Sequence, residues 1–257
     1  AEFSKHWKIA AGTFQCLEKT PPNVSELRKT ILQLAVMGRL GSPFAARVES
    51  GLPFALPERW AWTRIEDVAV SVDYGTSHKA SADDVGVPVL RMNNIRDGKV
   101  YLDDVKYVPK GIDDLPRLFL EQGDLLFNRT NSYELVGKAG VFLAENRRYT
   151  FASYLIRVAL DLRRADSRFV NLALNSPYFR ETQIEPELTQ QCGQANFSGG
   201  KLKASLIPLP PLAEQKRIVA KVDELMKLCD ELEALMKRAE SDGARLFDAV
   251  VKGLMAV

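Results

Sequence analysis

The feature that most constrains the fold is a run of apolar residues near the C-terminus that repeats every seven residues. From Ile218 onward, apolar or small residues recur at alternating steps of four and three, which is the spacing of a coiled-coil seam. This spacing predicts a helix over about residues 212–254, roughly 60 Å long at about 1.5 Å per residue. The residues expected to pair with a second helix are Ile218, Val222, Leu225, Cys229, Leu232, Met236, Leu246 and Val250. The alternative is an ordinary core helix, but such a length would exceed the width of the preceding domain, which favours a helix built for a partner.

The bulk composition allows a folded domain and excludes several protein classes. A chain of 257 residues with 46% hydrophobic residues can bury a sizeable core. No apolar run approaches about 18 residues, so we expect neither a membrane span nor, from the polar N-terminus, a secretory signal. Three widely separated cysteines and two histidines do not predict a disulfide framework or a metal cluster. We therefore expect a cytoplasmic protein without a bound metal.

The chain divides into four parts by composition and turn signals. An N-terminal extension, residues 1–22, ends in two prolines, and residues 23–41 read as a short amphipathic helix closed by Gly38 and Gly41. Residues 42–207 carry short β-rich pieces, with strands expected at 69–72, 87–91, 124–126, 138–142 and 154–158 and helices near 169–175 and from 177. Residues 208–257 contain the long helix. Residues 193–200 are expected to form a loop and residues 206–212 a proline-rich linker. The predicted fold class is an α/β (α+β) globular domain followed by a long coiled-coil-forming α-helix.

The sequence contains no pattern that predicts catalysis. It has no GxxxxGK[ST], GxGxxG, HExxH, CxxC or GxSxG motif. The tetrapeptide that starts at Asn175 resembles the NPPY-type motif of amino-methyltransferases, but Ser176 stands at its second position and no glycine-rich cofactor loop precedes it. A serine followed by Pro177 is better explained as a helix cap with proline at the first helical position.

Four polar loops combine arginine, asparagine, lysine and aromatic residues. They are residues 74–81, 91–94, 128–132 and 190–201. Arginine can read guanine, and asparagine or glutamine can read adenine, in the major groove, while lysine, serine and threonine suit phosphates. The loop that starts at Asn128 is the sharpest candidate, because a hydrophobic strand delivers four hydrogen-bonding side chains in a row. The net charge is only +2, so the alternative of plain surface loops stays open.

Four segments in order resemble the specificity subunits of type I restriction–modification systems. They are VPVLRMNNI, GDLLFNRTNSYELVGKAGVF, YTFASYLIRV and GQANFSGGKLKASLIPLPPLAEQKRIV, beginning at residues 87, 123, 149 and 193. LPERWAWTRIEDVA, from residue 56, is similar to the usual entry of their target recognition domain. The resemblance covers nearly all of the chain from Leu27 onward. Specificity subunits carry two recognition domains and two helices, so this chain resembles a one-domain half or a fragment.

The resemblance implies roles for the features above. Residues 42–207 would be a DNA-binding target recognition domain, and residues 208–257 would pair helices and dock methyltransferase subunits. The residues expected at the DNA are Ser77, His78, Lys79, Arg91, Asn93, Asn94, Arg129, Thr130, Asn131, Lys138, Asn196 and Lys201, with Lys138 and Lys201 expected at phosphates.

The family resemblance also implies partners and cofactors. The partners would be double-stranded DNA, modification and restriction subunits, and a second copy or second half-subunit bound through the long helix. The chain itself would be non-catalytic and hold no cofactor, whereas S-adenosylmethionine, ATP and magnesium would bind the partner subunits. Two alternatives remain: the recognition domain of a fused restriction–modification nuclease, and a coiled-coil adaptor that does not bind DNA.

Overall fold

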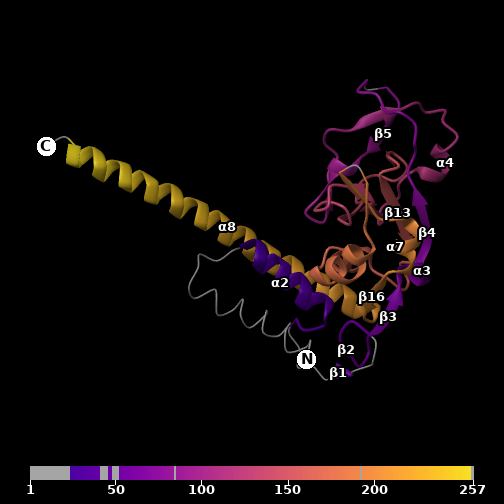
Figure 1. The fold of residues 1–257 in the computed structure, drawn as a ribbon, viewed down its shortest axis with the longest axis horizontal. Helices are drawn as coiled ribbons and strands as arrows, with labels where there is room; N and C mark the ends of the chain where they lie inside the picture. Colours follow the sequence, from indigo (N-terminus) through magenta and orange to yellow (C-terminus); the bar gives the residue numbers. More distant parts are fainter. Residues whose placement is uncertain (1–23, 41–45, 48–51, 84, 192, 256–257) are drawn as a thin grey trace. The chain divides into compact units, whose positions relative to one another are not determined.

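The computed structural model describes residues 24–40, 46–47, 52–83, 85–191 and 193–255, and these form two compact units (Figure 1). The globular unit comprises residues 32–219, and the helical unit comprises residues 24–31 together with residues 220–255. Helices α2 (Val24–Val36) and α8 (Leu212–Met255) each contribute to both units. The two helices that the sequence predicts at residues 23–41 and 212–254 are therefore present, and the predicted N-terminal extension lies outside the described residues.

Helix α2 ends where the sequence predicts, at a glycine. Gly38 has a φ of 69°, in the left-handed region that favours glycine. Its N–H donates to the Ala35 carbonyl (3.2 Å), and the next N–H, of Arg39, donates to the Leu34 carbonyl (2.9 Å). These two bonds occupy carbonyls that would otherwise be left open at the helix end.

The centre of the globular unit is a six-stranded sheet. Its strand order is β4-β13-β9-β11-β7-β6, and β13 pairs antiparallel with both β4 and β9. The bounds are β4 (Ala69–Tyr74), β13 (Leu155–Leu160), β9 (Leu125–Asn128), β11 (Ala139–Val141), β7 (Lys99–Val100) and β6 (Ile95–Arg96). The strands predicted at residues 69–72, 124–126, 138–142 and 154–158 all fall in this sheet, because their apolar residues alternate or run continuously as buried strands require.

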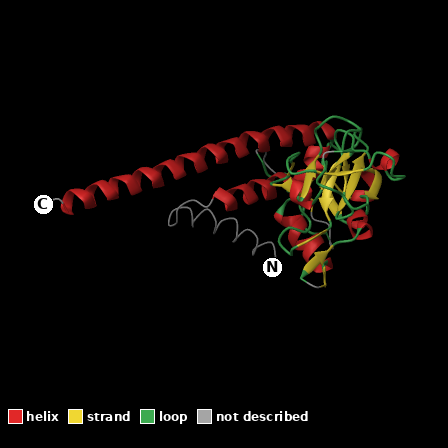
Figure 2. Cartoon of the chain, turned by 90° about the horizontal axis from the view of Figure 1, so that it is seen from above, coloured by secondary structure: helices red, strands yellow, loops and turns green. Residues whose placement is uncertain are grey.

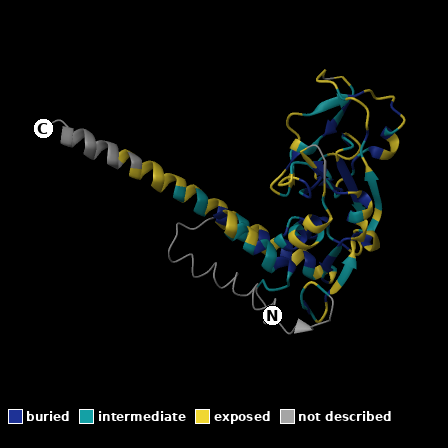
Figure 3. Ribbon diagram, viewed as in Figure 1, coloured by how far each residue is buried: buried dark blue, intermediate teal, exposed yellow. Residues whose placement is uncertain are grey.

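Buried apolar residues lie on both faces of the sheet. Figures 2 and 3 show the globular unit by secondary structure and by burial. Phe127 and Ile156 belong to the larger core, to which helices α5 (Ser167–Leu174), α6 (Pro177–Phe179) and α7 (Gly199–Ala204) contribute. Leu126 and Leu155 belong to a second core shared with helix α4 (Leu115–Leu118) and a three-stranded sheet. That sheet has the order β12-β5-β8, from β12 (Thr150–Phe151), β5 (Val87–Leu90) and β8 (Lys106–Val108).

Helices α5 and α6 begin as the sequence predicts, at capping side chains. Asp166 caps α5 by accepting from the N–H groups of Arg168 and Phe169, and Ser176 caps α6 by accepting from the Phe179 N–H. The cap interpretation of Ser176 and Pro177 is confirmed. Beyond α6, the chain continues in a π-helical turn η2 (Arg180–Ile184) and a short helix η3 (Glu185–Glu187).

Two segments expected to be irregular are partly strands, and these expectations were wrong. The predicted linker begins with β16 (Leu206–Leu209), which pairs antiparallel with β3 (Ala61–Arg64). The predicted loop at 193–200 contains β15 (Gln194–Asn196) and the start of α7. Strand β15 joins β10 (Thr130–Asn131) and β14 (Thr189–Gln191) in a small sheet. Each strand is created by a partner far away in the chain, so its local composition did not reveal it. The remaining elements are β1 (Ala46–Arg47), β2 (Leu56–Pro57), α3 (Ile65–Val68) and η1 (Met92–Asn94).

A buried arginine connects three strands of the central sheet. Arg157 on β13 is 8% exposed and pairs with Asp73 on β4 at 2.6 Å. It also lies 3.8 Å from Asp124, just before β9, and donates to the Phe119 carbonyl at 2.9 Å. Buried charges are tolerated only when they are paired in this way.

Gln215 anchors the first turns of α8 in the globular unit. Its side chain is fully buried and accepts from the Asp166 N–H (2.7 Å). Its amide donates to the carbonyls of Arg164 (3.1 Å) and Pro210 (2.8 Å). Ile218, which the sequence placed in the pairing seam, is buried in this same unit. Ile218 is therefore buried as a residue of the globular unit.

In the helical unit, α2 is tied to α8 by Arg28. Its guanidinium pairs with Asp230 at 2.7 Å and with Glu233 at 3.1 Å. The expected seam residues Val222 and Cys229 are each 2% exposed, while Leu225, Leu232 and Met236 are half-buried; the side chains of Leu246 and Val250 lie outside the described residues. Within the described part, residues 237–243 are all exposed. Among the described residues, no helix combines the length and apolar character that crossing a membrane requires.

Candidate nucleic-acid interface

Three of the four polar loops meet at one end of the central sheet. In the ladder, Tyr74 at the end of β4 is opposite Ile156, and Asn128 at the end of β9 is opposite Leu155. The chain therefore leaves β4 and β9 beside the start of β13. We call residues 74–79, 129–131, 153–154 and 196–201 the strand-end cluster.

Arg129 connects the parts of this cluster. Its guanidinium lies 4.9 Å from the centre of the Tyr74 ring and donates to the Ser153 carbonyl at 3.3 Å. The Tyr74 hydroxyl accepts from the Gly199 N–H at 2.7 Å, which ties in the start of α7. Arg129 remains half-buried, and its Nε is buried without a partner among the described residues. A guanidinium oriented by an aromatic ring and one carbonyl still has donors for a ligand.

The loop after β4 has a fixed base and an exposed tip. At Gly75, an added Cβ would lie 2.3 Å from the Ala152 carbonyl oxygen, so only glycine allows this approach. The Thr76 hydroxyl donates to Asp114 (3.0 Å) and accepts from the His78 N–H (3.2 Å). Beyond this base, the predicted residues Ser77, His78 and Lys79 are all exposed. The loop can therefore present three polar side chains without losing its position.

The loop after β9 is fixed by the small sheet. The Thr130 hydroxyl donates to Asn196 Oδ1 at 2.7 Å across the β10–β15 pair, and Thr130 is only 6% exposed. Asn131 Oδ1 accepts from the Ser132 N–H at 2.8 Å, which leaves its amide nitrogen available. Thr130 thus holds β10 to β15 through its side chain, and its expected role at the DNA stays a prediction.

The two predicted phosphate-binding lysines differ in their surroundings. Lys201 pairs with Glu187 at 3.2 Å and is half-buried near the start of α7. Lys138, at the start of β11, is also half-buried, and its ammonium makes no hydrogen bond or ion pair with any residue that the structure describes. Lys138 is therefore the freer of the two cations.

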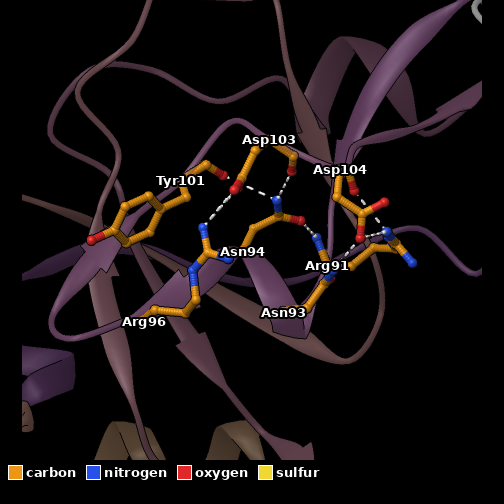
Figure 4. Close-up of polar contacts among 7 residues, drawn as sticks. All are labelled: Arg91, Asn93, Asn94, Arg96, Tyr101, Asp103 and Asp104. Atoms are coloured by element: carbon orange, nitrogen blue, oxygen red, sulfur yellow. Dashed lines mark hydrogen bonds and ion pairs between the residues drawn. The ribbon is translucent and has the colours of Figure 1, made fainter.

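The fourth loop, residues 91–94, begins a polar arm that extends to residue 104 (Figure 4). The start of the arm lies close to the strand-end cluster. The Leu90 carbonyl accepts a hydrogen bond from the Ala152 N–H (2.9 Å), and Ala152 forms a β-bridge with Thr76. Asn94 is fully buried: it accepts from the Arg91 N–H and donates to the carbonyls of Tyr101 (3.0 Å) and Asp103 (2.6 Å). These bonds occupy the Asn94 amide, so this residue shapes the arm, and its expected role at the DNA stays a prediction.

Acidic residues of the arm neutralise its arginines. Arg91 pairs with Asp104 at 3.0 Å, and Asn93 donates to the same carboxylate at 2.7 Å. Arg96 donates twice to Asp103, at 2.8 Å to each oxygen, and this contact lowers the pKa of the Asp103 carboxyl. Arg91 and Asn93 were predicted from their residue types, whereas their acidic partners were not.

The structure adds residues that the sequence analysis did not select. Tyr74 and Tyr154 are each 45% exposed at the strand ends, and the Ser153 carbonyl orients Arg129. The pairing of strands β4, β9 and β13, which brings these residues together, had no signal in the local sequence. Across the described ranges, no group of three or more histidine, cysteine, aspartate or glutamate residues is placed to hold a metal ion.

The chain thus combines a globular α/β unit that has polar loops at its strand ends with a long helix, and comparisons with known proteins identify the family. Residues 57–240 match the family described as the type I restriction modification DNA specificity domain, and the chain belongs to this family.

Curated relatives of the chain extend beyond the part that they share with it. The chain is 27% identical to the EcoAI type I restriction enzyme specificity subunit of Escherichia coli, over 97% of this chain and 48% of that protein. It is 29% identical to the EcoKI specificity subunit of Escherichia coli strain K12, over 86% of this chain and 47% of that protein. The chain thus spans about half the length of the curated relatives it matches.

Solved structures show the same fold. A chain of a type I R-M system aligns over 93% of this chain and 56% of its own length, with a TM-score of 0.59 and 20% identity. The HsdS subunit from Thermoanaerobacter tengcongensis aligns over 90% of this chain and 49% of its own length, with a TM-score of 0.54 and 19% identity. The predicted fold class, a mixed α/β domain followed by a long helix, is confirmed.

Proposed function

We propose that this chain reads one half of a split DNA target for a type I restriction–modification complex. The observation that carries the proposal is the Arg129 contact set, in which one guanidinium links Tyr74, Ser153 and, through Tyr74, the start of α7. This arrangement orients a bidentate donor at the end of a rigid sheet, as base recognition in the major groove requires. The exposed tip at Ser77, His78 and Lys79 and the free Lys138 add donors for bases and phosphates.

The long helix would set the distance between two half-sites. The segment of α2 that carries Arg28 pairs with α8, while Leu228 and Leu235, which lie seven residues apart on α8, are 54% and 60% exposed. Apolar side chains that recur every seven residues and stay exposed favour a further helix as partner. That helix would come from a second copy of the chain or from a second half-subunit.

Catalysis in this proposal belongs to partner subunits. Modification subunits would bind S-adenosylmethionine and methylate an adenine in the target, and restriction subunits would use ATP and magnesium. The role of this chain would be to position them on DNA, as a non-catalytic subunit working in the cytoplasm.

Replacement of Arg129 by alanine tests the proposed DNA face. In the complex with its modification subunit, we expect Arg129→Ala to reduce methylation of the target at least about 100-fold, because a good bidentate base contact contributes about 1–3 kcal/mol and the linked loops lose their common anchor. Size-exclusion chromatography with light scattering should show an unchanged complex. The exposed Arg163, which is 90% exposed and pairs with Asp161, provides a control arginine-to-alanine change with no expected effect. If Arg129→Ala prevents assembly, or leaves methylation intact, the assignment of this loop to DNA is wrong.

A further inference from the structure

The polar arm contains a binding site for an acceptor oxygen that is currently occupied by the chain's own carboxylate. One oxygen of Asp104, Oδ2, accepts from Arg91 Nη2 at 3.0 Å and from Asn93 Nδ2 at 2.7 Å (Figure 4). Arg91 Nη2 also donates to the Asp104 carbonyl at 2.7 Å. A charged and a neutral donor that converge on one anionic oxygen have the chemistry that binds a phosphate oxygen or the O6 and N7 edge of guanine.

We propose that Arg91 and Asn93 bind an acceptor oxygen of DNA, and that Asp104 competes for this site and thereby weakens binding to non-target DNA. The proposal rests on the proposed function, since it assumes that the chain binds DNA. Asp104 then acts as a residue that sets an affinity threshold: every DNA that uses this site must displace the carboxylate, and a non-target DNA meets that cost with fewer other contacts, so it is bound too weakly to be held.

The carboxylate is placed so that it can be displaced. The Asp104 side chain is 72% exposed, whereas that of Arg91 is 25% exposed. An ion pair this accessible to water contributes little free energy, so an incoming phosphate or base can replace it. Asp104 has a φ of 47°, a left-handed conformation that aspartate, asparagine and glycine tolerate better than other residues. A replacement at this position must therefore tolerate the left-handed backbone.

The rest of the arm does not depend on this carboxylate. The fully buried Asn94 accepts a hydrogen bond from the Arg91 N–H and donates to the carbonyls of Tyr101 and Asp103. Arg96 and Asp103 form a separate two-bond pair. Displacement of Asp104 would therefore leave the donors of Arg91 and Asn93 in place, ready for the new acceptor.

The site also lies on the proposed DNA face. Arg91 directly follows Leu90, whose carbonyl is bonded to Ala152, and Ala152 bridges to Thr76 at the base of the exposed loop tip. A ligand bound at the Asp104 position would thus continue the surface formed by the strand-end cluster.

Two substitutions at Asp104 test the competition, and Asp97 provides a matched control. Asp104→Asn removes the charge, and Asp104→Gly removes the acceptor; both replacements tolerate the left-handed backbone. Asp97 is also exposed, with a φ of 49°, and makes no hydrogen bond with Arg91 or Asn93 in the described structure. Asp97→Asn therefore repeats the same change of charge on the same arm, outside the site.

The measurement is the affinity of the complex with the modification subunit for target and non-target duplexes over a series of salt concentrations. We expect Asp104→Asn to bind non-target DNA about 3-fold to 10-fold more tightly, with the slope of log K against log salt steeper by about 1 if a phosphate is gained. Asp104→Gly should show a larger gain, and Arg91→Ala in the Asp104→Asn background should cancel it. A gain that is equal for all sequences identifies a phosphate as the ligand, whereas a gain that depends on guanine at one position identifies a base edge.

Three results would overturn the proposal. Unchanged or weaker binding of non-target DNA by both variants would mean that Asp104 positions the two donors and does not compete with DNA. An equal gain in Asp97→Asn would assign the effect to net charge. A gain that survives Arg91→Ala would place the ligand elsewhere. If instead the wild-type complex prefers no sequence at all, the proposed function fails, which is a distinct outcome.

Discussion

The helical unit and the globular unit are stabilised in different ways. In the helical unit, the apolar residues of α8 recur every seven residues in the sequence, and the ion pairs of Arg28 and of Lys237 with Glu233 involve at least partly exposed side chains. In the globular unit, single buried or half-buried polar side chains connect distant parts of the chain, such as Arg157 with Asp73, 84 residues apart, and Gln33 with the Tyr178 N–H, 145 residues apart. The helical unit should therefore tolerate changes that preserve its period, whereas the globular unit should be sensitive at particular residues.

The largest expected effect is at the helical seam. Leu232→Asp places a charge at a half-buried position one helical turn from both Leu228 and Leu235, where we propose that a second helix packs, and burying an unpaired charge costs several kcal/mol. We expect self-association to weaken by at least about 1,000-fold, or about 4 kcal/mol. Light scattering or sedimentation of the purified complex measures this change. Ala234→Asp, on the exposed face of the same helix, should leave the assembly mass unchanged. An unchanged mass for Leu232→Asp would refute helix pairing through this seam.

The next largest effect is expected at Arg157 in the globular unit. Arg157→Leu keeps the apolar packing but leaves Asp73 and Asp124 without their central partner. Removing one partner of a buried ion pair costs about 3–5 kcal/mol of stability. Because Arg117 also pairs with Asp73, we expect the free energy of unfolding to fall by about 3 kcal/mol, at the lower end of this range. Urea unfolding followed by tryptophan fluorescence measures the change. Arg163→Leu, at an exposed pair, should change stability by less than about 0.5 kcal/mol. Similar losses of stability in Arg157→Leu and Arg163→Leu would contradict the distinction between buried and exposed ion pairs.

A smaller effect is expected where α8 enters the globular unit. Gln215→Leu leaves the Asp166 N–H and the carbonyls of Arg164 and Pro210 without their buried partner. Each unsatisfied buried group costs about 1–3 kcal/mol, partly offset by the gained apolar side chain, so we expect a net loss of about 2 kcal/mol. Hydrogen exchange should show faster opening of the first turns of α8. Exchange that is unchanged there would mean that apolar packing alone anchors the helix. The exposed Lys216→Leu change is the control.

The smallest effect concerns pH. Burial opposes ionisation of Asp73, but hydrogen bonds from Arg157 and Ser71 outweigh burial and lower the pKa of this carboxyl. Because its pKa is lower in the folded state, Asp73 adds stability above its unfolded pKa of about 4 and loses it as the pH falls through the folded value. Burial raises the pKa of Asp124, so this residue has the opposite effect on the free energy of unfolding. The charged carboxylate destabilises the fold above the raised pKa, and this destabilisation disappears as the pH falls through that pKa.

These opposite signs can be separated by substitution. Asp73→Asn should be about 1 kcal/mol less stable than wild type at neutral pH, and the difference should close below about pH 4. For Asp124→Asn, we expect no loss of stability relative to wild type that disappears at low pH. Unfolding curves recorded between about pH 7 and about pH 3 measure both. A loss for Asp73→Asn that is independent of pH would show that its hydrogen bonds matter and its charge does not.

The sequence predicted the parts of this fold that depend on local periodicity. The seven-residue repeat predicted α8, and the alternation or continuity of apolar residues predicted β4, β5, β9, β11 and β13. The sequence failed where an element depends on a distant partner. Pro208 suggested a linker, yet it lies in β16 opposite Trp62, where the strand has a single neighbour and can tolerate a residue without an N–H.

The candidate site shows the same limit. Residue type placed Arg129, Arg91 and the loop at residues 77–79 among the candidates, and the structure brings their loops to adjoining strand ends. Residue type alone could not show that Asn94 and Thr130 are buried and internally bonded, because both are as polar as their exposed neighbours. It also could not reveal Asp104, which lies ten or more residues beyond the side chains that it binds.

The most direct test of the central claim is to express this chain with its modification subunit and map methylated adenines across the host genome. If the chain reads one half-site and pairs with a second copy through α8, the methylated sites will share a split motif whose two halves are palindromic. Methylation without a shared motif, or a single unsplit motif, would contradict the account.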